Sequence, residues 1–286
     1  MTRFVLGSLF LNCQGQIYSE EYSDFIGNRS LIESKYALDC KQPLGAMFAS
    51  LYLKLSDGYE DGTVYGYYNI PKLFGLQDTG SMEASGILQV RENPDLKLDG
   101  SGVLIGFVDT GIDYAGSIFL KQDGTTRVIA IWDQTIPAES TIRLPELPTT
   151  LENITRTPEG FLYGSEFTHE QLNAAVKMED AYEGISSRDE NGHGTFLASI
   201  AAGNELPDGS FTGAAPKADI AMVKLKPAKN RLRAYYQIKE DAVSYQENDI
   251  MAGVLYLVSL AKKRQQPLVI CLGLGTNAGS HRGGLP

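Results

Sequence analysis

The sequence predicts an α/β fold, in which a parallel sheet with helices on both faces is preceded by a small α+β unit. From Val103 onward, apolar strand-like runs alternate with helix-like segments, a pattern typical of a parallel sheet covered by helices. The earlier part is rich in tyrosine and carries short alternating pieces such as 50–55, which indicate half-buried strands. We therefore divide the chain into an N-terminal region, 1–97, and a second region, 98–286.

The second region opens with a buried strand. A turn-rich passage with Gly100 and Gly102 marks the boundary. The run VLIGFV (103–108) is continuously apolar, as expected of a strand buried on both sides. A long polar insertion is predicted at about 121–188, and a helix is predicted to begin near His193.

Two strands and a helix are predicted for the remainder of the chain. A strand is predicted in DIAMVKL (219–225). In NDIMAGVLYLVSLAKKR (248–264), apolar residues fall on one face of a helix, namely Ile250, Val254, Leu257, Val258 and Ala261. Pro267 precedes a further apolar strand, LVICLGLG (268–275).

Composition excludes several classes of protein. The formal net charge of −10 repels phosphate backbones and anionic membrane surfaces, so no nucleic-acid partner is expected. The apolar runs fall short of the roughly 20 residues that cross a bilayer, so no transmembrane segment is expected. The cysteines, Cys13, Cys40 and Cys271, have no metal-binding spacing, and a disulfide is not expected. Cys271 lies in an apolar run and is interpreted as a small buried hydrophobe.

Two residues are candidates for chemistry. Asp109 follows the buried strand directly, so its carboxylate is expected at the carboxyl end of a parallel sheet, where such folds place their sites. His193 lies between two glycines at the start of a predicted helix, which would let its ring face a cleft. The alternatives are an aspartate that caps a turn and a histidine that makes only core contacts.

Four blocks in the sequence resemble the subtilase family of serine proteases. VLIGFVDTGID (103–113) and DENGHGTFLASIAAG (189–203) resemble its aspartate and histidine blocks. GAAPKADIAMVKL (213–225) resembles a GxAP-containing strand of the family, and ICLGLGTNAG (270–279) resembles the strand that forms one wall of the substrate cleft. The resemblance implies a subtilisin-like parallel sheet.

A narrower resemblance is to the clostridial subtilases that include the spore-germination proteases. It rests on DGTTRVIAIWDQT (123–135) and YGSEFT (163–168). The N-terminal stretch 4–11 is apolar, but Asn-Cys-Gln follows it where a signal peptide has a small-x-small cleavage site. An intracellular or spore-associated location is therefore favoured slightly over secretion, and the location stays open.

The family resemblance implies roles for individual residues. His193 would be the general base that takes a proton from a serine, and Asp109 would fix its tautomer, so we expect these two side chains to be in contact. Gly273, Leu274 and Gly275 would lie along the cleft and pair with the extended backbone of a protein or peptide substrate. No cofactor is required. No calcium motif is present, although a structural calcium ion is an open alternative.

The resemblance also implies what is missing. The family's nucleophilic serine in a GTS-type motif and its oxyanion-hole asparagine both follow the cleft strand, so they are expected beyond Pro286. Asn277 corresponds to the turn after that strand, and Ser199 and Ser280 lack the GTS context. The chain alone is therefore expected to be inactive, with an incomplete sheet, because a covalent mechanism without nucleophile and oxyanion donor loses nearly all its rate. Residues 1–97 occupy the place of a propeptide.

The sequence also suggests four alternatives. An aspartic protease is suggested by Asp-Thr-Gly at both Asp78 and Asp109, but these are too close in sequence to head two lobes. A dinucleotide site at Gly273-x-Gly275-x-x-x-Gly279 departs from the GxGxxG spacing. An anion site is suggested by the basic run VKLKPAKNRLR (223–233), but this run is interpreted as a solvated connection because the chain around it is acidic. A subtilase relative that binds a partner or peptide without catalysis stays open.

Overall fold

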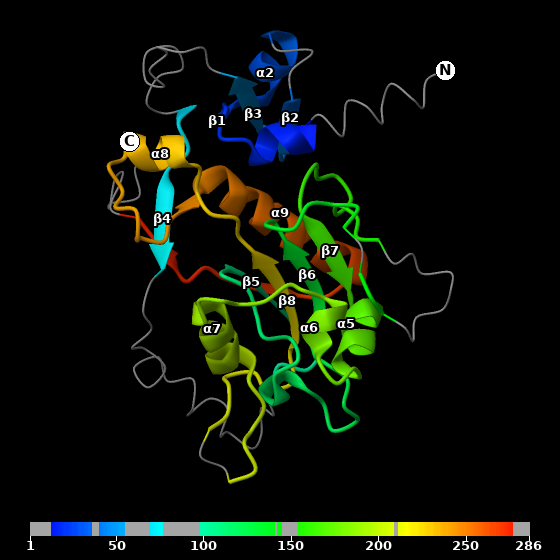
Figure 1. Cartoon of the computed structure of the whole chain (residues 1–286). Coiled ribbons are helices and arrows are strands. Elements are labelled where there is room, and N and C mark those ends of the chain that lie inside the picture. The colour runs from blue at the N-terminus through cyan, green and yellow to red at the C-terminus, as the bar shows by residue number, and fades with distance from the viewer. Residues whose placement is uncertain are drawn as a thin grey trace.

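The structure, a computed structural model, describes residues 13–35, 40–54, 69–76, 98–140, 142–144, 154–208 and 211–276. Its centre is a five-stranded sheet (Figure 1). In spatial order the strands are β10 (Leu268–Cys271), β5 (Leu104–Asp109), β8 (Asp219–Lys224), β6 (Val128–Asp133) and β7 (Ser165–Thr168). The first four are parallel, and β7 is antiparallel to β6.

Helices cover both faces of this sheet, which confirms the predicted fold class. One face carries α9 (Glu247–Arg264), and the other carries α5 (His169–Val176), α6 (Ala181–Gly184) and α7 (His193–Ala202) (Figure 1). As predicted, β5 is an interior strand between β10 and β8, and each of its residues is buried. Its continuous apolar run follows from burial on both sides.

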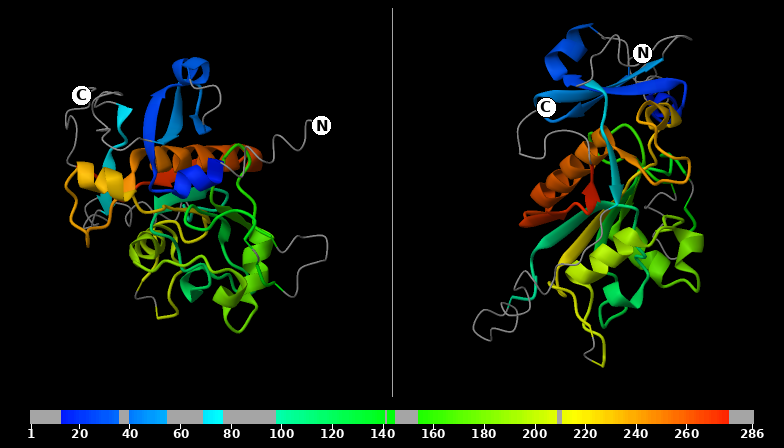
Figure 2. Two further views of the ribbon diagram at one scale, coloured as in Figure 1. Left: turned by 45° about the horizontal axis from the view of Figure 1, so that its top comes forward. Right: turned by 90° about the vertical axis from the view of Figure 1, so that its left-hand side faces the viewer.

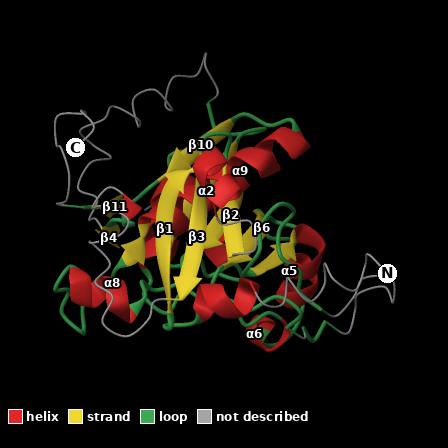
Figure 3. Cartoon of the chain, turned by 90° about the horizontal axis from the view of Figure 1, so that it is seen from above, coloured by secondary structure: helices red, strands yellow, loops and turns green. Residues whose placement is uncertain are grey.

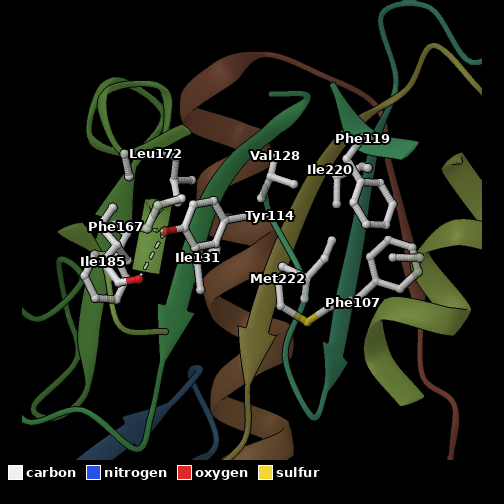
Figure 4. Close-up of a cluster of buried hydrophobic side chains, with 14 of the residues drawn as sticks. Phe107, Tyr114, Phe119, Val128, Ile131, Phe167, Leu172, Ile185, Ile220 and Met222 are labelled. Carbon is white, nitrogen blue, oxygen red and sulfur yellow. Dashed lines mark hydrogen bonds between the residues drawn. The ribbon is translucent and has the colours of Figure 1, made fainter. Parts of the chain in front are cut away.

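Alternate residues of each strand supply two separate cores. Phe107 and Met222 point into the cluster beneath α5, α6 and α7 (Figure 4). There the single hydroxyl hydrogen of Tyr114 is shared between the carbonyl oxygens of Ala181 and Ile185. Their neighbours in β5 and β8, such as Val108, face the opposite way and pack with α9. A strand alternates its side chains, so one apolar run serves both faces.

The segment 121–188 was predicted to be a polar insertion, and this prediction is wrong. It contains β6, a strand in which all six residues are buried, together with β7, α5 and α6. The physical reason is the run VIAIWD (128–133), whose side chains are divided between the two cores and whose Trp132 is fully buried. The described part of this segment therefore supplies two strands and two helices to the fold.

The basic run 223–233 was interpreted from the sequence as a solvated connection, and this interpretation is wrong. Lys224, Lys226 and Lys229 are all buried. Each ammonium group contacts a carboxylate from a segment that is distant in sequence, and these partners are Glu190, Asp249 and Asp24. Burial of a charge is tolerated when it is paired and hydrogen bonded, so distant carboxylates make this burial possible.

The N-terminal region forms a small antiparallel sheet of order β1-β3-β2. Its elements are β1 (Tyr22–Asn28), α2 (Arg29–Lys35), β2 (Cys40–Leu44) and β3 (Phe48–Lys54). Seen from above, this sheet lies over α9 (Figure 3), and the side view shows it as a separate layer (Figure 2). Tyr52 and Leu44 share one apolar cluster with Tyr256 and Leu257 of α9, so the two parts pack together.

Cys13 and Cys40 form a disulfide in the structure, which corrects the expectation that the cysteines are unpaired. Their Cα atoms lie 5.2 Å apart because the helical segment 13–18 packs against the end of β2. This separation is within the usual range for a disulfide. Cys271 is free and packs against the core beneath α5 to α7.

A second small sheet joins the two regions of the chain. It has the order β11-β4-β9 and consists of β11 (Leu274–Gly275), β4 (Leu73–Leu76) and β9 (Tyr245–Gln246). The chain between β8 and β9 includes the short helix α8 (Asn230–Tyr235). Strand β4 comes from the region predicted to precede residue 98, yet both of its partners come from the second region. The proposed division after residue 97 itself stays a prediction.

Several sequence interpretations concern residues outside the described ranges. They are the apolar stretch 4–11, the first Asp-Thr-Gly at Asp78, the turn at Asn277, and Gly279 and Ser280. Within the described ranges, no helix is both long and apolar enough to cross a membrane.

Candidate active site

Asp109 is the last residue of β5 and lies at the carboxyl end of the central sheet. Its side chain is buried, with 1% of its surface exposed. Oδ1 accepts a hydrogen bond of 2.7 Å from the backbone amide of Thr110. The buried parallel strand therefore places a carboxylate at the carboxyl edge of the sheet, where open α/β proteins have their binding and active sites.

His193 is the first residue of α7, directly after Gly192, whose φ of 87° lies in the left-handed region. Nδ1 of its ring lies 2.8 Å from Oδ1 of Asp109. The predicted contact between the two side chains is therefore present. A carboxylate only accepts hydrogen bonds, so Nδ1 carries the proton and donates it, which assigns the lone pair of the neutral ring to Nε2.

The electrostatic setting of Asp109 is shaped by burial. Burial raises the pKa of this carboxyl above its ordinary value, although the hydrogen bonds from His193 and Thr110 act in the opposite direction. Its second oxygen, Oδ2, is buried and has no hydrogen-bond partner among the described residues. The ionised carboxylate is thus stabilised mainly through Oδ1, which accepts hydrogen bonds from Nδ1 of His193 and from the amide of Thr110.

Two glycines allow the segments around the pair to approach closely. A Cβ on Gly194 would overlap the carbonyl oxygen of Gly111, so α7 starts in direct contact with the loop after β5. A Cβ on Gly273 would overlap the side chain of Leu197 and would lie 3.2 Å from Cε1 of His193. The residue before β11 is therefore packed against the histidine ring.

The residues predicted to line a substrate cleft lie next to the Asp109–His193 pair. Gly273 abuts the pair, and Leu274 and Gly275 form β11. In the structure β11 pairs antiparallel with β4 of the same chain, with Leu274 opposite Leu76 and Gly275 opposite Gly75. The edge of β11 is therefore already hydrogen bonded to an extended segment.

Sequence reasoning missed Asp189, Thr110 and Thr195, which surround the pair. Their side chains form hydrogen bonds with one another and with the backbone on both sides of His193. The sequence does contain a signal for these residues, because all three lie within four positions of Asp109 or His193. Aspartate and threonine are residue types that commonly cap the start of a helix. Ser199 donates its hydroxyl hydrogen to the carbonyl oxygen of Thr195, 2.8 Å away, within the helix.

Among the described residues, no group of three or more histidine, cysteine, aspartate or glutamate side chains is arranged to hold a metal ion. The arrangement at the carboxyl end of β5 is suited to proton transfer, because the aspartate orients the histidine ring through Nδ1 and the neutral ring can take up a proton at Nε2.

The fold and this pair define a class of protein: an α/β protein in which a buried aspartate at the carboxyl end of the central parallel strands is hydrogen bonded to a histidine. The model of the subtilase family, Peptidase S8, matches residues 100–285. The chain belongs to the subtilase family.

Individual relatives support this assignment. The solved structure of the Clostridium perfringens CspB protease matches with 30% sequence identity and a TM-score of 0.51, over 70% of this chain and 35% of that one. The subtilisin-like protease SBT3.8 of Arabidopsis thaliana is 31% identical over 133 residues, which are 44% of this chain and 16% of that protein. SBT3.3 of the same plant is 26% identical over 163 residues, 54% of this chain and 19% of that protein. The chain thus spans only a minor part of each relative.

Proposed function

We propose that the complete protein is a serine endopeptidase in which Asp109 and His193 are two members of the catalytic triad. The observation that carries this proposal is the 2.8 Å hydrogen bond between Nδ1 of His193 and Oδ1 of Asp109 in a chain of the subtilase family. His193 takes a proton from the serine hydroxyl at Nε2 and returns it to the leaving amine. Asp109 holds the ring in the required tautomer and stabilises the imidazolium. The mechanism needs no cofactor.

The serine itself is proposed to come from outside these 286 residues. No Gly-Thr-Ser sequence occurs in the chain, and Ser199 is engaged within α7. The 286-residue chain alone is therefore proposed not to hydrolyse peptide bonds. Loss of one member of a catalytic triad removes most of the rate enhancement, because the members act as one unit.

The substrate is proposed to bind as an extended strand along Gly273, Leu274 and Gly275. Support comes from β4, which shows that β11 accepts an antiparallel partner at this place. On its other side β4 is paired with β9, where Leu73 lies opposite Gln246. A peptide backbone inserted between β9 and β11 would form hydrogen bonds on both edges.

The N-terminal region is proposed to act as a propeptide. It packs on α9 through a shared apolar cluster, and β4 fills the strand position next to the Asp109–His193 pair. It would therefore assist folding and block access of other peptides. Deletion of 1–97 from the complete protein, followed by addition of the separate region, tests this role. Unchanged folding and activity after the deletion would contradict it.

The proposed activity is tested with the full-length protein and the 286-residue chain side by side on an unstructured protein substrate. Cleavage by the full-length protein, lost in His193→Ala and blocked by a serine-directed reagent, is the expected result. Cleavage by the 286-residue chain would overturn the assignment of the missing serine. A full-length protein that binds peptides without cleaving them would favour the alternative function, a subtilase scaffold that holds a partner in the same cleft.

A further inference from the structure

Three segments meet at the Asp109–His193 pair and must be held in register. They are the loop after β5 (109–113), the segment 188–192 and the first turn of α7. Gly111, with φ of 130°, passes under the second segment, where a Cβ would lie 2.9 Å from the carbonyl oxygen of Arg188. The distance between the two functional side chains therefore depends on how the three backbones are tied together.

One carboxylate, that of Asp189, ties all three segments. Its Oδ1 accepts hydrogen bonds from Oγ1 of Thr110 at 2.7 Å and from the amide of Gly192 at 2.9 Å. Its Oδ2 accepts hydrogen bonds from the amide and from Oγ1 of Thr195, at 2.8 and 2.6 Å. The donors are the residue after Asp109, the residue before His193, and the residue two positions after His193.

The two threonine hydroxyl groups extend these ties across the site. Oγ1 of Thr110 accepts a 2.9 Å hydrogen bond from the amide of Gly194, and Oγ1 of Thr195 accepts a 3.0 Å hydrogen bond from the amide of Asp113. A carboxylate only accepts, so each hydroxyl hydrogen points to Asp189 and each hydroxyl lone pair is left for an amide. Each threonine thus connects the loop after β5 to the start of α7.

The charge of Asp189 suits its position. Gly192, at the N-cap of α7, has no side chain that can cap the helix, and Asp189 accepts the first-turn amide of Thr195 instead. A negative charge is favourable at a helix N-terminus. Partial burial would raise the pKa of Asp189, but the hydrogen bonds from Thr195 and Thr110 hold it below its ordinary value. The carboxylate is therefore ionised at neutral pH.

We propose that Asp189 is a positioning residue that sets the hydrogen bond between Asp109 and His193 by tying the residues next to each of them to one carboxylate. It acts through Thr110 and Thr195 and does not touch the reacting atoms. The catalytic consequence rests on the proposed function, whereas the geometric claim does not. A role confined to capping α7 would change the stability of the protein and leave the Asp109–His193 bond as it is.

The test uses Asp189→Asn, which keeps the size of the side chain but cannot accept hydrogen bonds through its amide nitrogen. The matched control is Glu190→Gln, which removes the neighbouring carboxylate, whose side chain is 70% exposed and pairs with Lys224. The first readout is the downfield proton resonance of the Nδ1–H of His193 in the full-length protein, assigned with His193→Ala. We expect Asp189→Asn to lose or shift this resonance and Glu190→Gln to keep it.

The second readout is the kinetics of peptide cleavage by the same proteins. Displacement of catalytic groups by about 1 Å can lower the rate about 10²-fold. Asp189→Asn is therefore expected to lower kcat by about that factor with KM unchanged. Unchanged resonance and unchanged kcat in Asp189→Asn would overturn the proposal, even if the variant melts earlier. A wild-type protein without the downfield resonance would also overturn it.

A second pair of variants guards against loss of folding in Asp189→Asn. Thr195→Val removes the hydroxyl that joins Asp189 to the amide of Asp113, and Thr195→Ser retains it. We expect the valine variant to lose the His193 resonance and the serine variant to keep it, and equal behaviour of the two would contradict the proposal. If the wild type cleaves no peptide, the resonance alone decides the role of Asp189, and the protease assignment fails separately.

Discussion

Oδ1 of Asp109 and Nδ1 of His193 lie 2.8 Å apart, although 84 positions separate the two residues in the chain. The aspartate ends a buried parallel strand and the histidine starts a helix on one face of the same sheet. The pair exists because the loop after β5 and the start of α7 touch at Gly111 and Gly194. Changes at this contact therefore act on both function and stability.

Replacement of the aspartate is predicted to reduce proteolysis by the complete protein strongly. In Asp109→Asn the amide no longer fixes the tautomer of His193 or stabilises its charged form. Loss of the aspartate in other proteases with this triad lowers kcat by about 10⁴-fold. The measurement is kcat on a peptide substrate, and a loss of less than about tenfold would contradict the assigned role.

The same substitution is predicted to stabilise the fold at neutral pH. Burial raises the pKa of Asp109 in the folded protein, so the folded state binds the proton more tightly than the unfolded state does. Stability therefore falls as pH rises from the ordinary pKa of about 3.9 through the raised value, and the cost persists above it. Asp109→Asn removes this cost. Its gain in Tm should be largest near about pH 7 and should shrink toward about pH 4, and a lower Tm than wild type at neutral pH would contradict this.

Gly273→Ala is predicted to disturb the site by overpacking. The new Cβ would overlap Leu197 and would press on the ring of His193. Overpacking of this kind costs about 1–3 kcal/mol, and the ring displacement should also lower kcat. The control is Gly15→Ala, where a Cβ would meet no atom within 4 Å. Urea unfolding of both variants measures the difference, and equal stabilities would show that the segment before β11 yields easily.

Lys229→Met is predicted to weaken docking of the N-terminal sheet. The ammonium group of Lys229 contacts the buried carboxylate of Asp24 in β1 and donates to the carbonyl oxygen of Tyr22, 3.1 Å away. Removal of one partner leaves a buried charge and costs about 3–5 kcal/mol. Asp24→Asn added to Lys229→Met should recover part of this loss, because the uncompensated charge is gone. Failure of the double variant to recover any stability would argue against a charge effect.

An exposed ion pair of the same sheet supplies the control for that prediction. Lys54 and Glu21 lie 2.8 Å apart, with 63% and 69% of their side chains exposed. Exposed pairs contribute about 1 kcal/mol or less, so Lys54→Gln should change the free energy of unfolding little. A loss as large as that of Lys229→Met would show that burial does not distinguish the two pairs.

The disulfide between Cys13 and Cys40 is predicted to be chemically detectable. In denaturant without reductant, a thiol reagent should label only Cys271 in the 286-residue chain, and with reductant it should label all three cysteines. Intact-mass measurement counts the labels. Cys13→Ser should lower stability by about 2–4 kcal/mol, and three labels without reductant would show that the bond is not formed.

Local sequence pattern determined the central strands and the long helix. The apolar run 103–108 and the helical spacing of apolar residues in 248–264 are local properties, because burial of a strand or a helix face depends on its own periodicity. Of the five residues predicted on one face of α9, Ile250, Leu257 and Ala261 are buried, and Val254 and Val258 are partly buried. Asp109 and His193 were candidates from their positions at the end of a buried strand and at the start of a helix, and the family resemblance implied their roles. Strand β6 has an equally clear apolar run, VIAIWD (128–133). It was not predicted as a strand, because the surrounding segment 121–188 is mainly polar and was interpreted as an insertion.

The tertiary structure alone decided which distant groups meet. The burial of Lys224, Lys226 and Lys229 depends on carboxylates that β1, α9 and the segment 188–192 bring to them. The pairing of β4 with β11 and the convergence of Thr110 and Thr195 on Asp189 likewise join residues far apart in sequence. The local sequence does not show whether a lysine will be buried beside a carboxylate or without one. A buried lysine is tolerated when it is paired and destabilises the fold when it is unpaired, so the partner brought by the tertiary structure decides the outcome.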